Sequence, residues 1–160
     1  MNLMKRSGKP YLYGILLTEA VGGLAALLTQ EGTKLYSLTI RKPPLSPPSA
    51  VFPIAWTILY ALMGVSAARI YQFPPSAARS AALRLYLIQL AVNFAWSILF
   101  FNFQAFGLAF FWLILLCALI VRMILSFREL DAPAGWLQLP YLLWVFFAGY
   151  LNYGVWMLNR

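Results

Sequence analysis

Residues 41–56, "RKPPLSPPSAVFPIAW", place five prolines in sixteen positions and then enter an apolar run. Proline fixes the backbone angle φ and lacks an N–H donor, so the first four of these prolines are incompatible with a helix interior. The fifth, Pro53, suits the first turn of a helix, where an N–H group would have no partner. The segment therefore predicts a stiff connection that ends where a helix begins, near Val51.

The rest of the chain is unusually apolar. Hydrophobic residues make up 62% of its 160 residues and charged residues only 10%, and the mean hydropathy is +0.76. A soluble core of this size cannot bury so much apolar surface, whereas a bilayer removes it from water directly. We therefore predict an all-α integral membrane protein in which a single domain covers residues 1–160.

Five apolar stretches have the length of about 20 residues that a transmembrane helix needs. They predict a five-transmembrane-helix bundle with a long proline-rich loop, from Gln30 to Ala50, between the first and second helices. The predicted spans are Tyr11–Thr29, Val51–Tyr71, Ala81–Phe101, Ala105–Phe127 and Trp136–Leu158.

Composition also excludes several kinds of site. The chain has no histidine and one cysteine, Cys117, so a disulfide within the chain and the usual zinc, haem-histidine and Cys/His sites lack their residues. We therefore expect no metal and no cofactor. The net charge of +8 comes from cations scattered beside apolar runs, which indicates membrane topology and no nucleic-acid partner.

The cations are unevenly divided between the two sides of the predicted bundle. An excess on the amino-terminal side predicts that the amino terminus is cytoplasmic, in the cell membrane if the source is bacterial. The cations on the amino-terminal side are Lys5, Arg6, Lys9, Arg69, Arg79, Arg84, Arg122 and Arg128, and those on the other side are Lys34, Arg41, Lys42 and Arg160.

Polar and aromatic residues share faces inside two of the predicted spans. Asn93 and Trp96 are three residues apart, and Trp144, Ala148 and Asn152 follow one another at intervals of four. An unpaired amide in hydrocarbon costs several kcal/mol, which directs these faces toward the bundle interior. Two interpretations remain open: hydrogen bonds between helices, or a cavity for a flat hydrophobic ligand.

Two features of the first span also leave alternatives open. Glu19 is either a proton or ion site or a protonated carboxyl within the bundle. Small residues at Gly14, Thr18, Gly22 and Ala26 form a ridge, which favours close helix packing either inside the bundle or in a homodimer.

Several motifs closely resemble the tryptophan-rich sensory protein (TspO) family, also known as translocator proteins or peripheral-type benzodiazepine receptors. They are "KPPLSPP" at 42–48, "VFPIAWTILY" at 51–60, "NFAWSILFF" at 93–101 and "LPYLLWVFFAGYLNYGVW" at 139–156. The resemblance implies five transmembrane helices and a pocket, covered by the first loop, that binds porphyrins and other aromatic ligands. It also implies cholesterol binding in animal members.

The resemblance further implies the site residues. By position, the ligand-binding residues are Pro47, Pro48, Trp56, Asn93, Trp96, Trp144 and Ala148. The family also links Trp56 and Trp144 to light-dependent breakdown of protoporphyrin, which would make them catalytic. At the mouth of such a pocket, Lys34, Arg41 or Lys42 is suited to pair with ligand carboxylates.

We accordingly expect a sensor or carrier of protoporphyrin-like tetrapyrroles that regulates tetrapyrrole metabolism or a stress response. The alternatives are a light-dependent porphyrin-degrading enzyme and a transporter of sterol or membrane lipid. Two departures matter: Leu45 replaces the loop tryptophan common in the family, and the cholesterol-recognition pattern after Tyr153 lacks a cation by one position. The chain holds no acid–base pair or nucleophile for catalysis in the dark.

Overall fold

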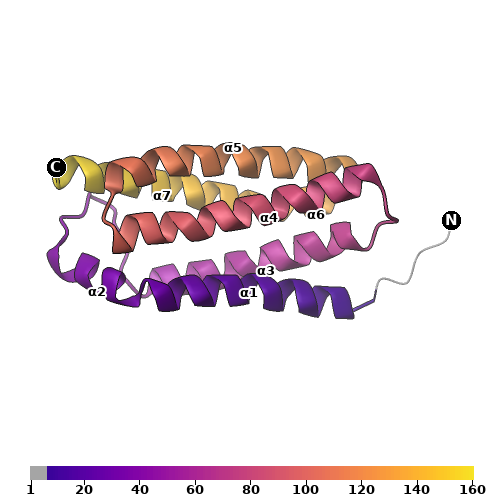
Figure 1. Cartoon of the computed structure of the whole chain (residues 1–160), viewed down its shortest axis with the longest axis horizontal. Helices are drawn as coiled ribbons and strands as arrows, with labels where there is room; N and C mark the ends of the chain where they lie inside the picture. The colour runs from indigo at the N-terminus through magenta and orange to yellow at the C-terminus, as the bar shows by residue number, and fades with distance from the viewer. Residues whose placement is uncertain (1–6) are drawn as a thin grey trace.

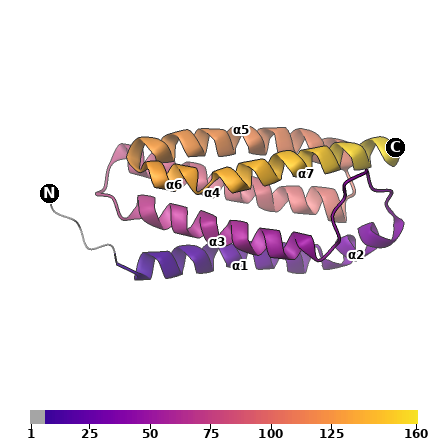
Figure 2. The ribbon, with the colours of Figure 1, turned by 180° about the vertical axis from the view of Figure 1, so that it is seen from behind.

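Five long helices lie side by side in the computed structural model, which describes residues 7–160 (Figures 1 and 2). Helix α1 packs mainly on α3, and α5 packs between α4 and α7. The bounds are α1 (Lys9–Leu28), α3 (Val51–Tyr71), α4 (Ala77–Ser97), α5 (Phe106–Leu130) and α7 (Leu139–Leu158). The π-helical turn η1 (Ile98–Asn102) extends α4, and the short helix α6 (Ala132–Trp136) precedes α7.

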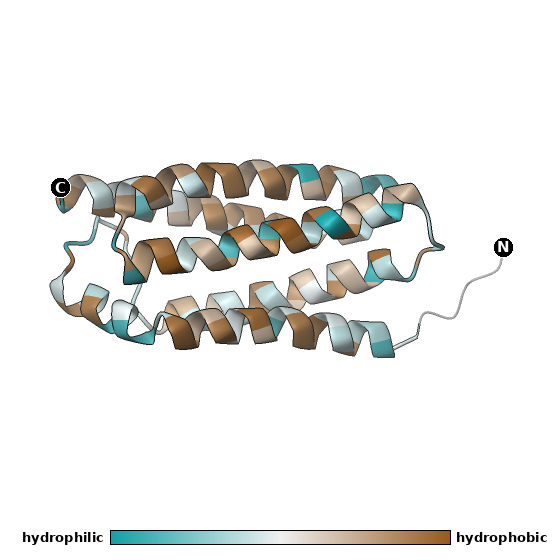
Figure 3. Cartoon of the chain, viewed as in Figure 1, coloured by the Kyte–Doolittle hydropathy of each residue, from teal (hydrophilic) through white to brown (hydrophobic). Residues whose placement is uncertain are grey.

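These elements confirm the predicted fold class. The described residues are helical or irregular and contain no strand, and five of the helical segments are long and apolar enough to cross a membrane. Figure 3 shows apolar residues over most of the bundle's length and polar ones gathered toward its two ends. Large apolar side chains such as Leu27 and Leu143 are exposed on the outer faces, as expected for surfaces that meet lipid.

The first half of the loop predicted from Gln30 to Ala50 is helical, and the loop prediction is wrong there. Helix α2 (Gln30–Thr39) follows α1 directly. An isolated helix of ten residues is marginal in water, so its stability comes from packing. Gly32 lies so close to η1 that a Cβ atom there would be 2.5 Å from the Phe101 carbonyl oxygen. The Tyr36 ring packs edge-on against the Phe101 ring at a centroid distance of 5.4 Å.

Helix α4 begins four residues before the predicted start at Ala81. Pro74 and Pro75 separate it from α3, and the Ser76 hydroxyl oxygen accepts a hydrogen bond of 3.1 Å from the Arg79 backbone N–H. This contact caps the first turn. The "PPS" sequence was therefore a helix-start signal.

The ridge of small residues on α1 serves packing inside the bundle. A Cβ atom on Gly14 would be 2.5 Å from the Gly64 carbonyl oxygen of α3, and one on Gly22 would be 2.3 Å from the Tyr60 ring. The approach of the α1 backbone to the α3 backbone at Gly14, and to the Tyr60 ring at Gly22, requires glycine. Ala26 continues the ridge but is exposed.

Candidate functional site

An aromatic cluster joins α3 to α7 and contains both tryptophans predicted to act on a ligand. The Trp56 and Trp144 rings meet edge to face, with centroids 6.5 Å apart and planes at 85°. Tyr60 stacks on Trp56 at 5.3 Å, and Phe52 packs against Trp144 at 6.0 Å. These four residues are called the tryptophan cluster below. Both indoles are half-buried, so the cluster lies between the bundle core and its surface.

Asn93 on α4 contributes a polar group beside this cluster. Its side chain is 1% exposed, and its Nδ2 donates a long hydrogen bond of 3.5 Å to the Tyr60 hydroxyl. Its Oδ1 is a buried acceptor without a hydrogen-bond partner. An unsatisfied buried acceptor costs about 1–3 kcal/mol, so a donor that reached this oxygen would be bound favourably.

Trp96, one turn further along α4, belongs to a different set of contacts. Its indole Nε1 donates to Asn152 Oδ1 at 3.1 Å, and the Asn152 Nδ2 donates to the Phe106 carbonyl oxygen at 2.8 Å. The Trp96 ring stacks on Phe100 at 5.2 Å. These two hydrogen bonds connect α4 to α7 and α7 to α5. Trp96 and Asn152 therefore stabilise the packing of the helices whether or not a ligand binds near them.

Ala148 lies on α7, one turn after Trp144 and one turn before Asn152. It is buried and belongs to the hydrophobic core. The predicted stripe along α7 therefore faces the bundle interior at Ala148 and Asn152 and reaches its margin at Trp144.

The proline-rich segment 40–50, called the lid below, is attached to the last turns of α7. The Tyr150 hydroxyl donates to the Pro44 carbonyl oxygen at 2.8 Å. Pro43 lies against Gly154, where a Cβ atom would be 2.5 Å from the proline Cβ. Asn159 pairs with the backbone of Arg41, accepting from its N–H at 3.0 Å and donating to its carbonyl oxygen at 2.8 Å.

Pro47 and Pro48 stand where the lid enters α3. Pro47 is half-buried and Pro48 is exposed, and the Pro48 carbonyl oxygen accepts from the Val51 N–H at 3.0 Å. Both prolines lie in the lid, shortly before Trp56 in the first turns of α3. Leu45, the departure noted in the sequence, is 82% exposed and has a φ of 67°, a left-handed conformation that is unfavourable for residues with a Cβ atom.

The three predicted anion contacts are exposed at the same end of the bundle as the lid. Lys42 lies over the Tyr36 ring, with its Nζ 5.4 Å from the centroid, and donates to the Ser37 carbonyl oxygen at 3.3 Å. Burial raises the pKa of the Tyr36 phenol. Lys34 and Arg41 belong to α2 and the lid, respectively.

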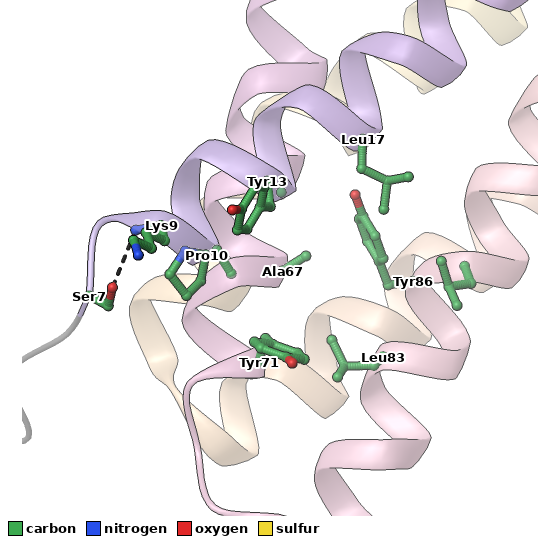
Figure 4. A pocket seen from close by; sticks show the side chains of 12 residues that line it. Ser7, Lys9, Pro10, Tyr13, Leu17, Ala67, Tyr71, Leu83 and Tyr86 are labelled. Carbon is green, nitrogen blue, oxygen red and sulfur yellow. Dashed lines mark hydrogen bonds between the residues drawn. The ribbon is translucent and has the colours of Figure 1, made fainter.

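A cleft of about 560 Å³ lies at the other end of the bundle, between α1, α3 and α4 (Figure 4). None of the predicted site residues lines it. The sequence did not predict it, although Lys9 and the small residues Gly14, Ala67 and Ala68 on two spans are part of its wall.

Comparison with known proteins assigns the chain to a family. The TspO/MBR family model matches residues 14–157. This chain belongs to the TspO/MBR family. It is 36% identical to the tryptophan-rich protein TspO of Chlorobaculum tepidum, over 88% of this chain and 89% of that protein. It is 35% identical to the translocator protein of Bos taurus, over 92% of this chain and 89% of that protein.

A third relative is the tryptophan-rich sensory protein of Cereibacter sphaeroides, 37% identical over 75% of this chain and 74% of that protein. The TspO/MBR match contains every predicted site residue, from Lys34 to Ala148. The resemblance inferred from the motifs is therefore confirmed. The chain is a multi-pass integral membrane protein of this family, with five helices able to span a bilayer.

Proposed function

We propose that this protein binds a porphyrin of the protoporphyrin type, or another flat hydrophobic ligand, at the tryptophan cluster beneath the lid. The observation that carries the proposal is the unpaired Oδ1 of Asn93, buried beside the Trp56–Tyr60 stack. Aromatic faces supply stacking area, and one unpaired acceptor orients a donor on the ligand.

Entry of a ligand requires rearrangement of contacts that the structure makes. Trp144 packs against both Phe52 and Trp56, so a flat molecule stacks on an indole only after these edge-to-face contacts separate. The lid is joined to α7 by a few polar contacts and one proline–glycine contact. It can therefore lift without disturbing the bundle. Lys34, Arg41 and Lys42 then offer charge-assisted hydrogen bonds to propionates.

The biological role that fits such a site is sensing or carrying a tetrapyrrole, with an effect on tetrapyrrole metabolism or a stress response. The names of the relatives, translocator protein and tryptophan-rich sensory protein, are compatible with either role. A light-dependent breakdown of bound porphyrin is the second candidate, because Trp56 and Trp144 are in contact with each other and one excited ligand would have two indoles near it.

A fluorescence titration tests porphyrin binding, and illumination of the same samples tests light-dependent porphyrin breakdown. Protoporphyrin IX added to the purified protein in detergent should quench tryptophan fluorescence, and Trp144→Phe should weaken binding about fivefold, because about 1 kcal/mol of aromatic contact is lost. Asn93→Leu should weaken it similarly. Trp136→Phe is the matched control, since Trp136 packs under Arg128 at the other end of the bundle.

Under illumination, porphyrin absorbance should fall faster with wild type than with the Trp56→Phe and Trp144→Phe variants.

Each of the two candidate functions would be contradicted by a different result. Equal affinity in wild type, Trp144→Phe and Asn93→Leu would remove the proposed site. Bleaching no faster with the protein than in detergent alone would remove the photochemical candidate and leave dark binding intact. A sterol that competes with protoporphyrin would instead favour the lipid-transport alternative.

We also propose that the amino terminus is cytoplasmic, in the cell membrane if the source is bacterial. In the structure, Lys9, Arg69, Arg79 and Arg128 lie at the end of the bundle that holds the start of α1, opposite the lid; Lys5 and Arg6 lie outside the described residues. Cytoplasmic loops carry the excess of Lys and Arg. A phosphatase fused after Arg160 should be active outside the cytoplasm, and an active cytoplasmic reporter at that position would reverse the orientation.

A further inference from the structure

The cleft at the amino-terminal end, called the amino-end cleft below, opens sideways between α1 and α4. Tyr13 and Leu17 form its α1 wall, and Leu83 and Leu87 form its α4 wall (Figure 4). Tyr13, Leu17 and Leu87 are also exposed on the outer surface of the bundle. In a membrane this surface meets hydrocarbon, so the side of the cleft is open to the lipid.

The packing of α1 explains why the cleft exists. Gly14 brings α1 into backbone contact with Gly64 of α3, which draws α1 toward α3. The remaining separation from α4 is bridged deeper in the bundle, where the Thr18 and Tyr86 hydroxyl groups form a hydrogen bond of 2.6 Å. Between this bridge and the end of the bundle, the small side chains of Ala67 and Ala68 form the floor.

The dimensions and lining suit one hydrocarbon chain. The volume of about 560 Å³ falls within the range of roughly 300–1,000 Å³ that is typical of small-molecule sites. From Lys9 to Leu17, α1 rises about 12 Å, which is close to the depth of one hydrocarbon leaflet, roughly 15 Å. The deeper lining residues are apolar except for Tyr86, whose hydroxyl is already bonded to Thr18.

One cation lines the mouth of the cleft, and a second cation lies against the ring of a lining residue. Lys9 lines it from α1. Arg79 stands at the amino end of α4 with its guanidinium 4.8 Å from the ring centroid of Tyr71, which also lines the cleft. Arg79 Nη1 donates to the Phe73 carbonyl oxygen at 3.0 Å, which orients the guanidinium. None of the chain's four acidic residues is among the lining residues.

We propose that the amino-end cleft binds an anionic glycerophospholipid, with one acyl chain between α1 and α4 and the phosphate between Lys9 and Arg79. The apolar inner part of the cleft accommodates the acyl chain. The two cations favour a lipid with a net negative charge over phosphatidylcholine, in which the choline group neutralises the phosphate. Anionic lipids are concentrated in the cytoplasmic leaflet, on the side where we place the amino terminus. The site is separate from the tryptophan cluster and does not depend on the proposed porphyrin function.

Native mass spectrometry of the full chain tests this proposal. The protein is equilibrated in detergent with equal amounts of phosphatidylglycerol and phosphatidylcholine that carry identical acyl chains. Wild type should retain phosphatidylglycerol in preference. Lys9→Gln and Arg79→Gln should each lower its retention about fivefold, as expected for loss of one cation near a lipid phosphate. Leu87→Trp, which fills the cleft from its exposed wall, should lower retention of both lipids.

Arg122→Gln is the matched control, because Arg122 is an exposed cation on α5, a helix that contributes no residue to the lining of the cleft. Equal retention of the two lipids by wild type would overturn the proposal. So would an Arg122→Gln loss as large as that of Lys9→Gln, which would indicate diffuse surface charge, or unchanged retention by Leu87→Trp. Lys9→Gln should leave protoporphyrin affinity unchanged and Trp144→Phe should leave lipid retention unchanged, so failure of one proposed site is distinguished from failure of the other.

Discussion

Gly64→Ala is expected to lower the free energy of unfolding by about 3 kcal/mol, the upper part of the usual range for overpacking. A Cβ atom at this position would be 2.6 Å from the backbone carbonyl carbon and oxygen of Gly14 and from the Ile15 Cα. Backbone atoms inside a helix cannot rotate out of the way, so α1 as a whole must move off α3. Unfolding by sodium dodecyl sulfate in mixed micelles, followed by circular dichroism, measures the change.

Gly23→Ala is the matched control, because it makes the same chemical change on α1 at a position with no atom within 4 Å of the new Cβ. There the methyl group should stabilise the protein by roughly 0.5 kcal/mol, since alanine favours a helix over glycine. Opposite signs at the two glycines are the expected result. A Gly64→Ala variant as stable as wild type would show that α1 is not held against α3 by this contact.

Removing either partner of the Arg69–Asp131 ion pair is expected to cost about 2–3 kcal/mol. The pair joins the last turn of α3 to the start of α6, through Arg69 Nε and Nη2 bonded to the two carboxylate oxygens at 2.5 and 3.1 Å. The side chains are 23% and 10% exposed. Loss of either side chain removes both of these charge-assisted hydrogen bonds, and partial exposure keeps the cost below the roughly 3–5 kcal/mol of a fully buried pair.

The measurement is a double-mutant cycle of Arg69→Ala and Asp131→Ala, read by the same unfolding titration. The double variant should lose less stability than the sum of the single variants, because each single variant already removes the same two hydrogen bonds. Arg84→Ala, at an exposed position on α4, should change stability by less than about 0.5 kcal/mol. Additive losses in the cycle would mean that the pair contributes no coupling and that each side chain acts through other contacts.

Most residues of the candidate site could be selected from the sequence, because hydropathy alone shows which tryptophans and amides lie inside a predicted span. Trp56, Asn93 and Trp144 stood out for this reason, and the structure brings Trp56 into contact with Trp144 and, through Tyr60, with Asn93. Their roles in binding remain predictions. Trp96 stood out by the same criterion, yet its indole is bonded to Asn152, a partner that spacing along one helix cannot identify.

Helix α2 and the amino-end cleft were not predicted from the sequence, because both depend on contacts between distant segments. Helix α2 is short and polar on average, and it is stabilised by the packing of Gly32 and Tyr36 against η1, which lies far from it in the sequence. The amino-end cleft arises from the distance between α1 and α4, which depends on how closely Gly14 approaches Gly64. Neither quantity is encoded in a local pattern.

Hydropathy, proline position and motif order by themselves determined the membrane class, the five helices, the connection before α3 and the family. These are local properties, because each span satisfies its own backbone hydrogen bonds in lipid and needs no partner to be recognised. Only the tertiary structure decided which helix faces meet. It attached the lid to α7 through Tyr150, Gly154 and Asn159, and it opened a lipid-facing cleft beside Lys9, because contacts between helices depend on side-chain volumes and distances that no single stretch contains.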